Sequence, residues 1–191
     1  MATKPGERKL QILQAIAEML EQPKGEKITT ALLAKRMDLS EAALYRHFAS
    51  KAQMFEGLIE FIEQTVFGLV NKITAEESGG MKQVEGILAL LLGFAQKNRG
   101  MTRVLIGDAL VNEDERLQAR INQLLDRIET TLKQALRIAV TQGELDASTD
   151  VAVRANVLLC YVIGRWQLFA KSGYARDPME QWAEQWAILS R

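Results

Sequence analysis

The sequence predicts an all-α protein in which a small N-terminal helical module precedes a larger helical body. Of its 191 residues, 48% are hydrophobic, 25% are charged and only three are prolines, the residue type that most strongly breaks helices. Apolar residues recur at helical spacing along most of the chain, and glycine-containing breaks separate the periodic segments. The length suits a small module of residues 1–50 joined to a body of residues 51–191.

The first two predicted helices belong to the N-terminal module. The first spans residues 6–21, where apolar side chains fall on one face, and a proline and a glycine at 23–25 end it. Either Thr29 or Thr30 is a suitable N-cap for the second helix, because a threonine hydroxyl can accept a bond from a free backbone N–H. This helix is expected to stop near Asp38.

A three-residue connection leads to the third predicted helix. The first position of such turns often needs a positive φ, which Asp38 tolerates better than most residues. Ser40 caps the next helix, at about 40–47, whose outer face carries small and polar groups around one aromatic. Phe48 is expected to anchor that helix to the core. The pattern indicates a helix-turn-helix, whose second helix fits a DNA groove.

The rest of the chain is helical in pattern. Ser50 suits the N-cap of a long helix from residue 51 to about 71, which links the module to the body. Further helices are expected at residues 81–97, 102–110, 113–142, 149–171 and 179–189. Cys160 lies in an apolar run, so we expect it to be a small buried hydrophobe, and a single cysteine forms no intrachain disulfide.

Charge and composition narrow the function. The net charge is zero, yet residues 1–55 carry nine Lys or Arg against six acidic residues, so a basic head precedes a mildly acidic body. One histidine and one distant cysteine give no zinc-site spacing, and we expect no metal or cofactor. No nucleophile and base constellation predicts an enzyme. No apolar run is long enough to span a bilayer, and the polar N-terminus does not resemble a signal peptide, so a cytoplasmic location is expected.

Residues 28–55, ITTALLAKRMDLSEAALYRHFASKAQMF, resemble the DNA-binding signature of TetR-family regulators. The resemblance implies a TetR-like fold, with an N-terminal three-helix helix-turn-helix domain and a C-terminal helical dimerisation domain. It also implies that the helix at about 40–47 enters the major groove of double-stranded DNA, and that a homodimer reads a palindromic site. Asp38 stands where the family commonly has glycine.

The same resemblance implies a set of DNA contacts. Thr29, Thr30 and Lys51, at the starts of their helices, suit phosphate oxygens, and Tyr45 and His47 suit phosphates or bases. Lys4, Arg8 and Lys9 could add contacts from an N-terminal arm. On spacing alone, Tyr45 could equally pack in the core. The implied contacts are Thr29, Thr30, Ser40, Glu41, Ala42, Tyr45, Arg46, His47 and Lys51.

Three body segments resemble the nucleoid occlusion branch of the TetR family: LIEFIEQ (58–64), LLLGFAQKNRGMTRVLIGDAL (90–110) and RLQARINQLLDRIE (116–129). This resemblance implies a nucleoid-associated protein with a groove for the C-terminal tail of the division protein FtsZ. Leu69 stands where a basic residue is expected, and Lys97 where an arginine is expected. Periodicity alone would make these residues core packing. The implied groove residues are Phe61, Leu69, Leu90, Gly93, Phe94, Lys97 and Asn98.

The last two predicted helices are implied to form the dimer contact, and higher-order assembly on DNA stays open. The implied interface residues are Trp166, Phe169, Trp182 and Trp186, for which an intrachain core is the alternative.

Two functions follow from the resemblance: a DNA-bound antagonist of FtsZ ring assembly over the nucleoid, or a ligand-responsive TetR-family transcriptional repressor. The repressor would need a cavity with convergent polar groups, which the aliphatic segments 81–110 and 151–169 scarcely offer.

Overall fold

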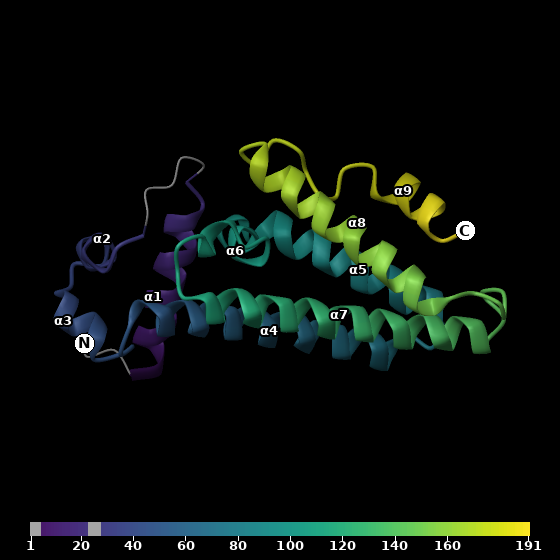
Figure 1. The fold of residues 1–191 in the computed structure, drawn as a ribbon, viewed down its shortest axis with the longest axis horizontal. Coiled ribbons are helices and arrows are strands. Elements are labelled where there is room, and N and C mark those ends of the chain that lie inside the picture. Colours follow the sequence, from purple (N-terminus) through teal and green to yellow (C-terminus); the bar gives the residue numbers. More distant parts are fainter. Residues whose placement is uncertain (1–4, 23–27) are drawn as a thin grey trace. The chain divides into compact units, whose positions relative to one another are not determined.

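A computed structural model describes residues 5–22 and 28–191, and all its regular elements are helices, as the sequence predicts (Figure 1). The helices are α1 (Pro5–Leu20), α2 (Thr30–Arg36), α3 (Glu41–Tyr45), α4 (Lys51–Glu76), α5 (Gly80–Lys97), α6 (Arg99–Leu105), the 3-10 turn η1 (Asp108–Leu110), α7 (Glu115–Thr141), α8 (Val151–Lys171) and α9 (Trp182–Leu189). The predicted arm contact Lys4 and the predicted break at 23–25 lie outside the described residues.

The chain divides into two compact units. Unit 1 combines Met1–Ile62 with Asn98–Ile121, and unit 2 combines Glu63–Lys97 with Asn122–Arg191. The boundary expected at residue 50 follows the sequence motif, whereas packing groups α6, η1 and the start of α7 with the N-terminal helices. The N-terminal module is therefore one part of a larger folded unit.

The packing of α1 on α6 organises unit 1. The two backbones meet at Gly100, where an added Cβ would lie 1.9 Å from the carbonyl oxygen of Ala17. One turn further on, Arg103 donates from Nη1 to the carbonyl oxygen of Leu20 at 3.2 Å and from Nε to Oδ2 of Asp108 at 2.8 Å. Arg103 thus ties α6 to the last residue of α1.

Gly100 also explains a wrong boundary. The sequence suggested a break at residues 99–100 and a helix from 102 to 110, but α6 begins at Arg99 and ends at Leu105. Glycine breaks helices in solution, yet here the missing side chain permits the approach to α1. Periodicity cannot distinguish these two uses of a glycine.

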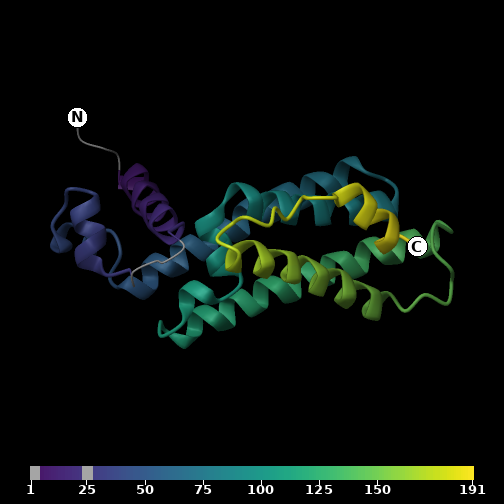
Figure 2. The same cartoon turned by 90° about the horizontal axis from the view of Figure 1, so that it is seen from above.

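Unit 2 is built around α5 and α8, which pack against each other (Figure 1). After α8 the chain turns back, and the segment leading to α9 runs antiparallel to α8 (Figure 2). Arg165 of α8 holds this segment by donating from Nη2 to the carbonyl oxygens of Asp177 at 2.7 Å and Glu180 at 3.1 Å. These hydrogen bonds to backbone carbonyls hold the returning segment against α8. Helix α9 itself has no buried residue.

The structure corrects three expectations about α8. Trp166 is only 1% exposed and donates from Nε1 to the carbonyl oxygen of Leu91 at 3.0 Å. Phe169 is also buried, and its ring meets that of Tyr174 edge-on, so both side chains belong to the core of unit 2 and not to a dimer surface. Cys160 is exposed, contrary to its predicted burial. Because α8 is apolar on more than one face, the sequence did not reveal which face points inward.

Replacing Gly100 tests the crossing of α1 and α6. Gly100→Ala should lower the free energy of unfolding by about 2 kcal/mol or more, because the new methyl group collides with backbone that cannot swing away. Gly68→Ala, on an open stretch of α4, should raise it by roughly 0.5–1 kcal/mol through helix propensity. Urea denaturation of both variants measures the contrast, and equal effects would contradict the close crossing.

Candidate nucleic-acid interface

Hydrogen-bonded caps define the helix-turn-helix of unit 1. The side chain of Thr29 accepts from the backbone N–H of Leu32 at 3.1 Å, which settles the choice between the two threonines. Ser40 caps α3 in the same way, accepting from the N–H of Ala43 at 3.2 Å, as predicted. Asp38 adopts a φ of 54°, confirming the left-handed turn position expected from the sequence.

One face of α3 is anchored and the other is open. Leu44 is completely buried and Phe48 nearly so, which fixes the helix against the core of unit 1. Tyr45 is 45% exposed, so the alternative that it packs in the core is wrong. Helix α3 ends at Tyr45, two residues earlier than expected, and His47 in the turn that follows is half-buried. The solvent-facing residues are Glu41, Ala42, Tyr45 and Arg46.

Three of the predicted contacts, Thr30, Glu41 and Lys51, have side-chain partners within the protein. Thr30 donates from its hydroxyl to Oε2 of Glu41 at 2.5 Å, which ties the start of α2 to the start of α3. Lys51 forms an ion pair with Glu113 and lies over the ring of Phe55, with Nζ 5.6 Å from the ring centroid. No pattern in the sequence indicates the second pair, because 62 residues separate its members.

The residues of the implied FtsZ groove differ in accessibility. In unit 2, Leu69 of α4 and Lys97 of α5 are exposed, and Leu90 is half-buried. A Cβ on Gly93 would meet no heavy atom within 4 Å, so this glycine is not needed for helix packing. Phe94 is buried, which corrects the expectation that it contacts a partner, because its side chain is part of the core.

The remaining two groove residues belong to unit 1. Phe61 lies on α4 and is half-buried, and Asn98 directly precedes α6. Their roles stay predictions.

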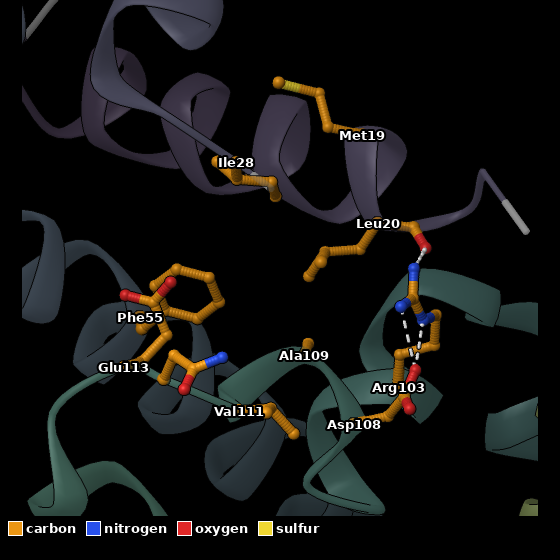
Figure 3. A pocket seen from close by; sticks show the side chains of 10 residues that line it. Met19, Leu20, Ile28, Phe55, Arg103, Asp108, Ala109, Val111 and Glu113 are labelled. Atoms are coloured by element: carbon orange, nitrogen blue, oxygen red, sulfur yellow. Dashed lines mark hydrogen bonds and ion pairs between the residues drawn. The ribbon is translucent and has the colours of Figure 1, made fainter. Parts of the chain in front are cut away.

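Unit 1 also contains a cavity of about 210 Å³ (Figure 3). The charged side chains that line it are already paired: Arg103 with Asp108, and Glu113 with Lys51. The lining residues are Met19, Leu20, Ile28, Phe55, Arg103, Asp108, Ala109, Val111, Asn112 and Glu113. Paired groups of this kind give a small ligand few free donors or acceptors.

Within residues 5–22 and 28–191, no three His, Cys, Asp or Glu side chains come together in a way that could hold a metal ion. Over the same ranges, no helix has both the length and the apolar character needed to cross a bilayer.

Comparison with known proteins agrees with this geometry. Residues 12–58 match the model of the tetR family of bacterial regulatory proteins. The regulator PfmR from Thermus thermophilus shares the fold with a TM-score of 0.77 at 21% identity, covering 95% of this chain and 97% of that one. The fatty acid degradation regulator FadR from Bacillus halodurans gives a TM-score of 0.80 at 14% identity, covering 100% and 97%. Fold and helix-turn-helix together define a TetR-family DNA-binding protein.

The body narrows the class further. Residues 79–191 match the SlmA-like model, described as a tetracyclin repressor-like C-terminal domain. The nucleoid occlusion factor SlmA of Alteromonas mediterranea is 54% identical over 100% of this chain and 97% of that protein. SlmA of a Marinomonas species is 50% identical, with the same coverage. The chain belongs to the SlmA family of nucleoid occlusion factors.

Two substitutions at Asp38, in the turn before α3, should change the free energy of unfolding in opposite directions. Asp38→Gly should raise the free energy of unfolding by roughly 0.5–1 kcal/mol, because glycine adopts a positive φ without a Cβ clash. Asp38→Val should lower it by more than about 1 kcal/mol, because a β-branched residue is strained there. Denaturant unfolding decides the matter. A loss of stability in both variants would mean that the aspartate side chain, and not the backbone conformation, matters.

Proposed function

We propose that this protein is a sequence-specific DNA-binding nucleoid occlusion factor. Bound as a homodimer to palindromic chromosomal sites, it binds the C-terminal tail of FtsZ and antagonises assembly of the FtsZ ring over the nucleoid. The observation that carries the proposal is 54% identity, along the whole chain, to a relative named for nucleoid occlusion. The function consists of binding alone and requires neither a catalytic step nor a cofactor.

The exposed face of α3 is the proposed DNA-reading surface. Ala42 and Tyr45 lie three residues apart and are both exposed, so they share one side of the helix. The small side chain of the first leaves room for the groove wall, and the aromatic ring of the second can contact a thymine methyl group or a phosphate. Arg46 supplies a positive charge at the end of the helix.

Tyr45→Ala tests this surface. DNA affinity should fall at least about tenfold, since a side chain at the centre of a recognition surface contributes on the order of 1–3 kcal/mol. The unfolding temperature should stay close to that of the wild type, because the ring is 45% exposed. Fluorescence anisotropy with a duplex selected by the wild-type protein gives the affinity. Unchanged binding would exclude α3 as the reading helix.

Dimerisation is proposed to use the outer face of α8 together with α9. Five of the exposed residues of α8 recur at helical spacing and are apolar or small: Val153, Val157, Cys160, Gly164 and Leu168. In α9, Ile188 is 69% exposed, and Trp182 and Trp186 stack on each other with centroids 5.8 Å apart. Exposed apolar side chains on two helices that bond to each other, as α8 and α9 do, are typical of an interface that a second subunit covers.

Cys160 lies near the middle of this face, which makes the proposed interface testable by cross-linking. A two-fold axis that pairs α8 with its copy brings the two midpoints together. A short bifunctional maleimide should therefore link two wild-type chains through this single cysteine. The matched control is Cys160→Ser combined with Gln134→Cys, which moves the thiol to the exposed side of α7. Efficient linking only in the control would contradict the interface.

The FtsZ tail is proposed to bind along α5. Gly93 has open space where a side chain would project, so an extended peptide backbone could approach there. Leu90 is half-buried and supplies apolar contact, while exposed Lys97 offers a positive charge to acidic groups of the peptide. A lysine in place of arginine provides a point charge without bidentate geometry, so this contact should be less directional.

Gly93→Arg should separate the two activities. A large side chain would fill the proposed peptide path, so affinity for a labelled FtsZ tail peptide should fall at least about tenfold. Affinity for a selected duplex should change less than twofold, as should both affinities in the control Gln123→Arg, which adds the same charge to α7. Fluorescence polarisation measures both ligands. Parallel loss of tail and DNA binding in a folded Gly93→Arg protein would contradict separate surfaces.

A further inference from the structure

One ion pair in unit 1 joins a predicted DNA contact to a distant acidic residue. Lys51 is the first residue of α4, immediately after the proposed recognition motif. Its ammonium group pairs with Glu113, which lies between η1 and α7. Both side chains are mostly buried, with 22% of the lysine and 12% of the glutamate exposed. A pair with so little exposure is less screened by salt than a surface pair.

The backbone around Glu113 holds its carboxylate in place. The Glu113 N–H donates to the carbonyl oxygen of Leu110 at 3.0 Å, and Asn112 takes a left-handed φ of 65°, so the segment forms a defined turn. Two neighbouring carboxylates are paired with other residues. Both carboxylate oxygens of Asp114 bind Arg116, at 3.0 and 2.8 Å, which holds the pKa of Asp114 at about 2 through these hydrogen bonds. Asp108 is paired with Arg103.

We propose that Glu113 is an intramolecular competitor of the DNA backbone for Lys51. In the DNA-free protein the carboxylate binds the ammonium group, and a phosphate takes its place when the duplex docks. The inference rests on the proposed DNA-binding function, which it deepens by naming a residue outside the helix-turn-helix that limits affinity. Because a phosphate contact is independent of sequence, Glu113 should weaken specific and non-specific DNA binding alike. DNA binding should also free the turn that carries Glu113.

Removal of the charge at Glu113 tests the competition. Full-length wild type, Glu113→Gln, Lys51→Met and the double variant are titrated at about 0.15 M salt against a labelled duplex that the wild type selects from random-sequence DNA. Glu113→Gln should tighten binding about fivefold, the scale of one partly exposed ion pair. Glu115→Gln removes the same charge two residues away, on an exposed side chain, and should tighten binding less than twofold. Lys51→Met should weaken binding and cancel the effect of Glu113→Gln.

Three results would overturn the inference: weaker or unchanged binding by Glu113→Gln, an equal gain in Glu115→Gln, or a gain that persists without Lys51. Lys51→Gln replaces the methionine variant if thermal unfolding shows that the latter is not folded at the assay temperature. Failure of the wild type to select any duplex would instead contradict the proposed function. The two failures are therefore distinguishable in one set of titrations.

Discussion

The close crossing of α1 and α6 is the contact on which unit 1 depends. Because Gly100 has no side chain, the backbone of α6 reaches the carbonyl oxygen of Ala17, and Arg103 then binds the carbonyl oxygen of Leu20. This crossing fixes the first helix of the DNA-binding module to a segment 83 residues later in the chain. The same segment leads through η1 to Glu113 and so to Lys51. The crossing and the Lys51–Glu113 ion pair therefore both join the N-terminal helices to the segment from α6 to the start of α7.

Local signals in the sequence predicted the local structure well. The capping residues and the positive φ of Asp38 depend on neighbours within a few residues. Such features can be inferred because propensity and side-chain capping act over one turn of helix. The number of α-helices in the body could be predicted for the same reason.

Features that depend on long-range packing could not be predicted in this way. In the sequence Gly100 indicates a break, because a glycine that allows close packing looks the same there as one that ends a helix. In α8, Trp166 points into the core and Cys160 points outward, the reverse of the expectation, because both faces are apolar enough to be buried. The pair of Lys51 and Glu113 joins residues whose neighbourhood only the fold establishes.

The central claim is that DNA binding and antagonism of FtsZ belong to one protein. The most direct test is sedimentation of FtsZ filaments with wild-type protein, with and without a duplex that the protein selects. The DNA-bound protein should lower the pelleted fraction of FtsZ, and FtsZ lacking its C-terminal tail should pellet normally. Unchanged sedimentation of intact FtsZ with a folded, DNA-bound protein would show that DNA binding and antagonism of FtsZ do not belong together.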